Sequence, residues 1–298
     1  MKQKVKIIFV AIMFAGIFTL AKISSAAIDL SAGYWETTYD CDEWDQSLGT
    51  FNCDGISRGG DWICDTSNPF KLEQITIDAN YPLGKGGKGQ RHWIGDGENI
   101  NSGGLILYFD SPQNEIWIRW YARWGKGFTF SDEYVLAHKL LYFSDGLYMD
   151  FNGWNGIRYI DSGREVAYSS SGGWNDIMDG RTGDGKWHGY QIHIKANTSD
   201  NNDGIAQIWI DDELILNSFE ANFTFEDALG WERVAVPSNQ RHPINGRCMY
   251  VDIDDIAVAT PGYTDFIQDD QGNLMIGSVT NDSPNTTAPL APSGLAVN

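Results

Sequence analysis

The sequence is short of cations, of cysteine and of long apolar runs. Its 298 residues include 21 Lys and Arg against 40 Asp and Glu, which gives a formal net charge of −19. Nucleic-acid binding depends on basic groups that neutralise phosphates, so this balance argues against a nucleic-acid partner. No run after residue 20 is long and apolar enough to cross a bilayer. No segment repeats apolar residues at the helical period over a long distance, so we expect no long amphipathic helix.

The one long apolar run lies at the N-terminus. Three lysines within the first six residues precede an apolar run over residues 7–20, and Ser24 and Ala26 form a small-x-small cleavage pattern. We therefore expect residues 1–26 to be a signal peptide. An uncleaved membrane anchor is the alternative interpretation of the same run. With cleavage, the mature protein has no membrane span and is secreted, periplasmic or at the cell surface.

Only four cysteines are present, at positions Cys41, Cys53, Cys64 and Cys248. An oxidising compartment outside the cell favours disulfides, and three pairings of four cysteines are possible. We expect at least one disulfide among the three N-terminal cysteines. If all four pair, one of them reaches Cys248 and ties the start of the domain to a late strand. A zinc site is disfavoured because the spacings match no usual ligand pattern.

Short alternating runs, punctuated by Gly, Asn and Asp, fill most of the chain. The clearest are residues 187–195 and 205–210, in which apolar and polar positions alternate around a polar loop, as in a β-hairpin. With 12 Trp, 13 Tyr and 14 Phe, the chain can bury one large core. We therefore predict an all-β fold, an antiparallel two-sheet jelly-roll sandwich over residues 27–276.

The C-terminal end has a different composition. From residue 277 onward Ser, Thr, Asn and Pro dominate, which is typical of a disordered linker. The last residues, 288–298, resemble the opening of a fibronectin type III module that stops before its core. We expect residues 277–298 to be a linker with a truncated start of such a module, as in a fragment or a truncated reading frame.

Two of the expected strands carry chemistry-bearing side chains on the face opposite their apolar residues. In the run over residues 115–124 this face bears Trp117, Arg119, Tyr121 and Arg123. In the predicted hairpin it bears Gln191, His193, Lys195 and Trp209. Guanidinium groups bind carboxylates in a fork, and aromatic rings offer flat apolar surfaces to sugars. This pattern predicts a site for an acidic glycan; alternatively, these are exposed strand residues whose long side chains cover aromatic surface.

The later strands resemble a known superfamily. Residues 184–188 (DGKWH), 203–204 (DG), 208–211 (IWID) and 252–258 (DIDDIAV) are similar to the closing strands of concanavalin A-like lectin/glucanase folds. More narrowly, they resemble the heparin-lyase-like and glucuronan-lyase-like polysaccharide lyases, over roughly residues 71–263. The resemblance implies a bent sandwich with a polysaccharide groove on its concave sheet. The Gln191–His193 triplet resembles one found in alginate-lyase-like members.

A lyase that acts on a uronate must neutralise the carboxylate, remove the C5 proton and protonate the leaving oxygen. We expect Arg119 and Gln191 to neutralise the carboxylate, and His193 and Tyr121 to transfer the protons. The remaining candidates are expected to bind substrate: Arg123, Lys139, Lys195, Trp209 and Trp117, of which the two lysines would also tune proton transfer electrostatically. The alternative for His193 is an ordinary strand residue beside Lys195.

Other chemistries have weaker support. A glycoside hydrolase needs two carboxylates flanking the bond, and the glucanase-type Glu-x-Asp-x-x-Glu or Glu-x-Asp-x-Glu strand is absent. No Gly-x-Ser-x-Gly elbow indicates a serine hydrolase. Asp252, Asp254 and Asp255 offer hard oxygens that suit calcium, whereas residues that only cap a turn would look the same. No other cofactor is expected.

The sequence thus favours an exported, monomeric, carbohydrate-active protein that binds an acidic, uronate-containing polysaccharide and cleaves it by β-elimination. The alternative is a non-catalytic glycan-binding or surface-adhesion module that uses the same aromatic and basic side chains. A glycoside hydrolase is the third and weakest hypothesis.

Overall fold

The structure, a computed structural model, describes twelve segments of the chain: residues 27–37, 39, 50–53, 56–59, 73–94, 105–128, 139–152, 156–173, 183–198, 201–223, 230–238 and 249–279. The expected signal peptide lies outside these residues, and so do Cys41, Cys64, Cys248 and the side chain of Cys53. The disulfide prediction therefore stays a prediction. Within the described segments, no helix has the length and apolar character needed to cross a membrane.

Almost every regular element in these segments is a strand, as the sequence predicted. The strands are β1 (Tyr34–Glu36), β2 (Thr50–Cys53), β3 (Ile56–Gly59), β4 (Glu73–Thr76), β5 (Gly89–Trp93), β6 (Leu105–Gln113), β7 (Glu115–Trp124), β8 (Lys139–Phe143), β9 (Tyr148–Phe151), β10 (Ile157–Asp161), β11 (Arg164–Ser169), β12 (His188–Lys195), β13 (Gly204–Ile210), β14 (Glu213–Ala221), β15 (Trp231–Val236), β16 (Tyr250–Ala259), β17 (Ile267–Gln268) and β18 (Leu274–Met275). Two short 3-10 helices, η1 (Ile77–Ala79) and η2 (Ser144–Gly146), complete the set.

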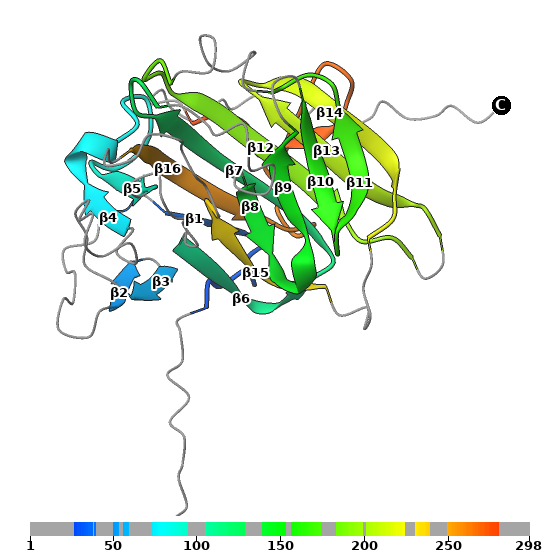
Figure 1. The fold of residues 1–298 in the computed structure, drawn as a ribbon. Helices are drawn as coiled ribbons and strands as arrows, with labels where there is room; N and C mark the ends of the chain where they lie inside the picture. Colours follow the sequence, from blue (N-terminus) through cyan, green and yellow to red (C-terminus); the bar gives the residue numbers. More distant parts are fainter. Residues whose placement is uncertain are drawn as a thin grey trace, which may run out of the picture.

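The strands form two large antiparallel sheets. The first sheet has the order β14-β13-β12-β7-β16-β5-β4, with β1 also paired to β16. The second sheet has the order β11-β10-β9-β8-β15-β6-β3-β2. Figure 1 shows β8–β11 crossing in front of β7, β12 and β13. This arrangement confirms the all-β, two-sheet jelly-roll sandwich.

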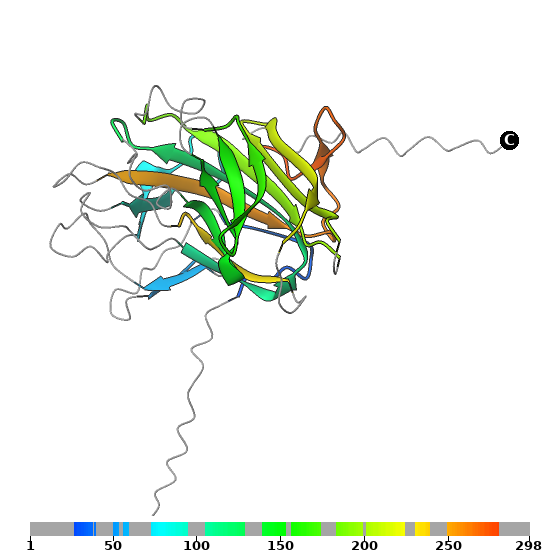
Figure 2. The ribbon, with the colours of Figure 1, turned by 45° about the vertical axis from the view of Figure 1, so that its right-hand side comes forward.

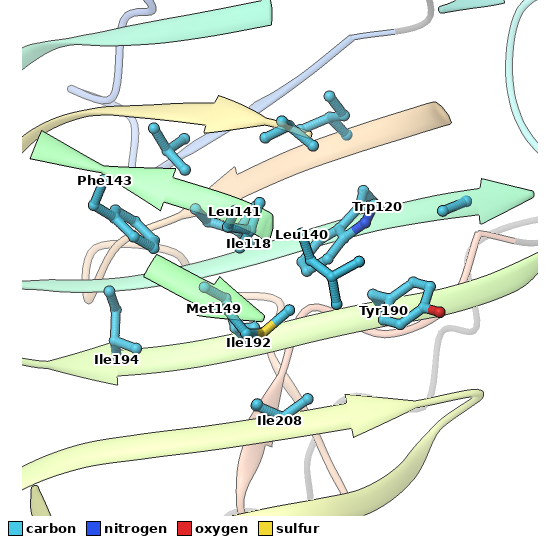
Figure 3. Packing of buried hydrophobic residues seen from close by; sticks show 14 of the residues in the cluster. Ile118, Trp120, Leu140, Leu141, Phe143, Met149, Tyr190, Ile192, Ile194 and Ile208 are labelled. Atoms are coloured by element: carbon cyan, nitrogen blue, oxygen red, sulfur yellow. The ribbon is translucent and has the colours of Figure 1, made fainter. Parts of the chain in front are cut away.

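The core lies between the inner faces of the two sheets, as the period-two pattern requires. From the first sheet, Ile118, Ile192 and Ile208 enter it, and they meet Phe143 and Met149 of the second sheet (Figure 3). All five are fully buried. Each such side chain contributes about 1.5–3 kcal/mol relative to an exposed one, so the inward parity of each strand is strongly fixed and its alternate residues must face outward.

The predicted hairpin is present as β12 and β13, with Ile192 opposite Ile208. One strand was not expected: the polar, Gly- and Asn-rich sequence of residues 91–104 predicts a loop, but residues 89–93 form β5. Its backbone pairs with β4 on one side and β16 on the other, so hydrogen bonding decides its structure although its side chains do not alternate. His92, expected in that loop, is fully buried.

Candidate functional site

The structure brings the four expected catalytic residues onto neighbouring strands of the first sheet. Gln191 on β12 lies opposite Arg119 on β7 and opposite Trp209 on β13. Two residues along, His193 lies opposite Trp117 on β7, and Tyr121 lies opposite Gly189. Because these positions alternate with core residues, they share the outer face of the sheet.

This outer face is covered by the chain itself. Residues 264–279, which we call the C-terminal strap, include the hairpin β17–β18 and run over the first sheet. Figure 2 shows this orange segment next to the yellow strands β13 and β14. The Arg119 guanidinium donates through Nη1 to the carbonyl oxygen of Gly277 at 2.8 Å, and the Tyr121 hydroxyl accepts from the backbone N–H of Val279 at 2.9 Å. The strap therefore occupies the groups that a substrate would need.

Other residues on this outer face also form hydrogen bonds with the C-terminal strap. Gln191 accepts through Oε1 from the N–H of Ile276 at 3.1 Å, and the Trp209 indole donates to an Asp269 carboxylate oxygen at 2.9 Å. The Trp117 indole donates to the carbonyl oxygen of Leu274. Arg119, Tyr121, Gln191 and Trp209 are all at most 6% exposed. Residues 277–279, which the sequence assigned to a linker, are thus part of this contact.

His193 is held by hydrogen bonds at both ring nitrogens. Nδ1 lies 2.7 Å from Oε1 of Gln207, and Nε2 lies 3.0 Å from Oε1 of Glu115. The amide orientation of Gln207 is fixed, because its Nε2 donates to the side-chain oxygens of Asn217 and Asn273. Oxygen atoms of Gln207 and Glu115 therefore occupy both nitrogens of the imidazole. Neither nitrogen is placed to accept a proton from a substrate.

The surroundings of His193 are equally closed. Its ring stacks on Trp117 with centroids 3.9 Å apart, and the interplanar angle is 7°. Lys195, expected to bind substrate, instead pairs with the second oxygen of Glu115 at 3.2 Å. Burial raises the pKa of Glu115, but its bonds to His193 and Lys195 outweigh burial and lower that pKa overall. The group forms a structural network of paired charges.

Arg123 lies further along the same face and is also paired. Its Nη2 lies 2.5 Å from Oδ2 of Asp252, whose Oδ1 is 2.7 Å from Nε of Arg91. The Arg91 guanidinium lies 3.8 Å from the centroid of the Tyr250 ring. One buried carboxylate is thus shared by two arginines. Sequence reasoning missed Arg91, because β5 was not expected.

The three aspartates considered for calcium do not converge. Asp252 is engaged by the two arginines, Asp254 accepts from the backbone N–H of Tyr81 at 2.6 Å, and Asp255 accepts from that of Lys85 at 3.1 Å. Among the described residues, no group of three His, Cys, Asp or Glu side chains could hold a metal ion. These aspartates hold loops and arginines in place.

Lys139 does not belong to the expected site, which corrects the sequence-based grouping. It lies on β8 of the second sheet, across the core from Arg119. There it lies opposite Asp150 on β9, which in turn lies opposite Arg158 on β10. In the neighbouring row Tyr142 lies opposite Tyr148. The sequence left Lys139 unassigned to a sheet, because local periodicity does not encode strand order.

These five residues form a compact group that we call the β8–β10 cluster: Lys139, Tyr142, Tyr148, Asp150 and Arg158. Arg158 binds Asp150 in a fork, with Nε to Oδ1 at 2.8 Å and Nη2 to Oδ2 at 3.4 Å. The Lys139 ammonium lies 4.1 Å from the Tyr148 ring centroid and 4.8 Å from that of Tyr142. Lys139, Tyr142 and Arg158 are half-buried. Two cations and two rings therefore share one outer face.

Burial shifts the ionisation of this cluster. It raises the pKa of Asp150 to about 6, although Arg158 and Lys139 act in the opposite direction. It lowers the pKa of Lys139, against a smaller opposing effect of Asp150. It also raises the pKa of Tyr148, and the Asp150 charge adds to this effect. The cluster thus combines an amine that loses its proton more readily with a phenol that retains its proton.

The short apolar runs at residues 138–143 and 147–151, separated by Ser-Asp-Gly, predict the two strands of this hairpin, but sequence reasoning missed the cluster. Tyr148 and Asp150 alternate with the core residues Met149 and Phe151, so parity alone would have placed both on an outer face. The signal that was overlooked is an acidic residue at an outer position between two strands that bear cations.

No protein-family model matches this sequence, and no curated protein matches it either. Among solved structures, an alginate lyase mutant in complex with an alginate tetrasaccharide is similar, with a TM-score of 0.43, 15% identity and coverage of 78% of this chain and 98% of that one. An endo-β-1,4-glucuronan lyase from Trichoderma reesei has a TM-score of 0.46, 12% identity and coverage of 76% and 94%. The binding domain of botulinum neurotoxin serotype D/C has a TM-score of 0.40, 12% identity and coverage of 63% and 42%. Likeness at this level assigns neither reaction nor ligand to this chain.

Proposed function

We propose that this protein is exported, binds an acidic, uronate-containing polysaccharide at the β8–β10 cluster and cleaves it by β-elimination. The observation that carries the proposal is the arrangement of Lys139 and Arg158 beside Tyr142 and Tyr148 on one outer face. In a protein of net charge −19, these two half-buried cations lie beside aromatic rings on one outer face. This arrangement suits a carboxylate on a sugar ring, because the cations bind the charge and the rings bind the apolar face.

The cluster offers a group for each part of the reaction. Arg158 neutralises the substrate carboxylate, which makes the C5 proton more acidic. Lys139, whose pKa burial lowers, takes that proton as a neutral amine. The electron pair forms the C4–C5 double bond, the C4–O bond breaks, and Tyr148 donates its phenolic proton to the leaving oxygen. The raised pKa of Tyr148 keeps this proton in place until it is needed.

We thus place the substrate site on the second sheet, although the sequence pointed to residues of the first sheet. On the first sheet, Arg119, Tyr121 and Gln191 are bonded to the C-terminal strap. A substrate would have to displace these three hydrogen bonds to reach Arg119, Tyr121 and Gln191. At the β8–β10 cluster, by contrast, Lys139 and Arg158 retain exposed surface.

A non-catalytic glycan-binding module is the second candidate. It is favoured by the Asp150–Arg158 fork, because a guanidinium whose charge is already shared with Asp150 does less to acidify the C5 proton of a uronate. In that case the rings and cations bind an acidic glycan, and no proton is transferred.

The test is incubation of the purified protein with a panel of polyuronates, with ultraviolet absorbance of unsaturated chain ends and affinity both recorded. If the protein is a lyase, the absorbance should grow with time in the wild type and should not grow in the Lys139→Ala and Tyr148→Phe variants. The matched control is Lys186→Ala, a lysine whose side chain is 76% exposed in the loop before β12. Binding without growth of absorbance would contradict the lyase hypothesis and support the non-catalytic binding module. Neither signal with any polyuronate would refute both.

A further inference from the structure

Asp150 occupies a central position in the β8–β10 cluster. It lies on β9 between Lys139 on β8 and Arg158 on β10, and its side chain is fully buried. The neighbouring residues Met149 and Phe151 enter the core, so the Asp150 carboxyl belongs to the outer side of the sheet. Arg158, which we propose to bind the substrate carboxylate, packs against this Asp150 carboxyl.

The fork between Arg158 and Asp150 occupies one of the two edges through which a guanidinium can bind a carboxylate, and Glu165 lies near the other edge. Nε and Nη2 both donate to Asp150, while Nη1 lies 3.6 Å from the exposed carboxylate of Glu165 on β11. A bidentate contact to a uronate requires two parallel N–H groups. While Asp150 is ionised, its charge neutralises Arg158 and repels a uronate that approaches the remaining edge of the guanidinium.

From these contacts we infer that Asp150 is a positioning residue that sets the affinity of the site: ionised, it withholds Arg158 from the substrate, and protonated, it releases Arg158. This inference rests on the proposed function, since it concerns the same site. It names a different property, namely that uptake of an acidic glycan is coupled to uptake of one proton by the protein.

The charges around Asp150 support such a coupling. The groups that face it are Lys139 from β8, Tyr148 from its own strand, Arg158 from β10 and, through Arg158, Glu165 from β11. Protonation of Asp150 raises the net charge of this set by one unit, which favours a bound uronate. Because burial raises the pKa of Asp150 to about 6, this change occurs near neutral pH.

The sign follows from linkage. If only the protein with protonated Asp150 binds, the apparent Kd is the intrinsic Kd divided by the protonated fraction. That fraction is close to one at pH 5 and small at pH 7.5, so the affinity should fall by up to about 30-fold over this range. Glycan carboxylates with an ordinary pKa of about 4 stay largely ionised throughout, so they do not produce the effect.

The experiment measures the Kd of the full chain for a size-defined oligouronate at pH 5, 6, 7 and 7.5, for the wild type, Asp150→Asn and Glu165→Gln. We expect weaker binding with rising pH in the wild type and in Glu165→Gln. In Asp150→Asn, we expect a nearly flat profile close to the wild-type affinity at pH 5. Glu165→Gln is the matched control, because it removes a carboxylate that contacts the same arginine but is 47% exposed.

The outcomes separate the inference from the proposed function. Binding with a flat wild-type profile would overturn the role of Asp150 and leave the glycan site in place. A slope that persists in Asp150→Asn would do the same, because another group would then be responsible. No binding at any pH would contradict the proposed function itself. If Asp150→Asn does not fold, the wild-type profile alone still decides, since a flat profile is incompatible with the inference.

Discussion

Gln191 accepts a hydrogen bond from the backbone N–H of Ile276, a residue 85 positions later in the chain. A side chain that the sequence marks for substrate binding is thus used to hold the protein's own C-terminal strap. The same holds for Arg119 with Gly277 and for Tyr121 with Val279. These three contacts use backbone groups of the strap, whereas Asp269 and Asn273 add contacts through their side chains to Trp209 and Gln207.

Replacing Arg119 by Ala should loosen the strap. The change removes a charged donor to the Gly277 carbonyl, and hydrogen bonds to charged groups are worth about 1.5–3 kcal/mol. We expect a comparable loss in the free energy of unfolding and faster hydrogen exchange at the Ile276 and Val279 amides. The control is Arg233→Ala, an exposed arginine on β15, which should change neither. Unchanged exchange in the Arg119 variant would contradict the strap contact.

His193→Ala should destabilise the protein without changing catalysis. It leaves the facing oxygens of Gln207 and Glu115 without their donor and removes the ring stacked on Trp117, at a cost of about 1–3 kcal/mol for the unsatisfied groups. Denaturant unfolding and the rate of polyuronate cleavage per folded molecule would be measured together. A variant of normal stability without activity would return the site to the first sheet.

The sequence predicts which side chains of the first sheet face outward, but it does not predict what covers them. A period of two fixes the face of each residue on a strand, so Arg119, Gln191 and Trp209 could each be assigned to an outer face, whereas only strand order decides whether they share one. Whether that face stays open depends on residues 264–279, which reach it through contacts far apart in sequence. No local pattern encodes such a contact.

The same limit explains the misplacement of Lys139. Two sheets have two outer faces, and only the order β10-β9-β8-β15 assigns Lys139 to the second sheet. β5 was missed for a related reason. Its residues are strand-forming because β4 and β16 flank them, and a strand that is held by its neighbours need not show alternation.

Asp252→Asn should be among the more damaging single changes on the first sheet. The Asp252 carboxylate is fully buried and is shared by Arg91 and Arg123, so the change leaves two largely covered guanidinium groups without their counter-charge. Removing one partner of a buried ion pair costs about 3–5 kcal/mol. Denaturant unfolding should show this loss, whereas Asp270→Asn, at an exposed position in the strap, should be nearly neutral. A loss below 1 kcal/mol would contradict the shared ion pair.

Stability should fall between pH 5 and pH 7.5. Burial raises the pKa of both Asp150 and Asp255 to about 6, above the usual value of 3.8. The contribution of a carboxyl with a raised pKa is complete below its unfolded value and is lost as the pH rises through the folded value. We expect a higher Tm at pH 5 than at pH 7.5, and a smaller difference in the Asp150→Asn, Asp255→Asn double variant. A Tm that rises over this range would contradict these shifts.

Lys139→Ala and Tyr148→Phe should each reduce polyuronate cleavage by about 10²- to 10⁴-fold, the range over which a positioned proton-transfer group acts. Both side chains project from the outer side of the second sheet, so we expect the Tm to stay within a few degrees of the wild type. Tyr148→Phe is the sharper test, because it retains the ring against which the Lys139 ammonium packs and removes only the hydroxyl. The binding affinity for the oligouronate should therefore change little while turnover is lost.

The matched control for this pair is Tyr142→Phe, which removes a hydroxyl from the adjacent ring of the same cluster. It should retain most of the turnover, since we assign its ring to contact with the sugar and assign no proton transfer to its hydroxyl. If Tyr142→Phe is inactive and Tyr148→Phe is active, Tyr142 and not Tyr148 is the acid that protonates the leaving oxygen. If neither hydroxyl matters while Lys139→Ala is inactive, the leaving oxygen takes its proton from the lysine, which then serves as base and acid in turn.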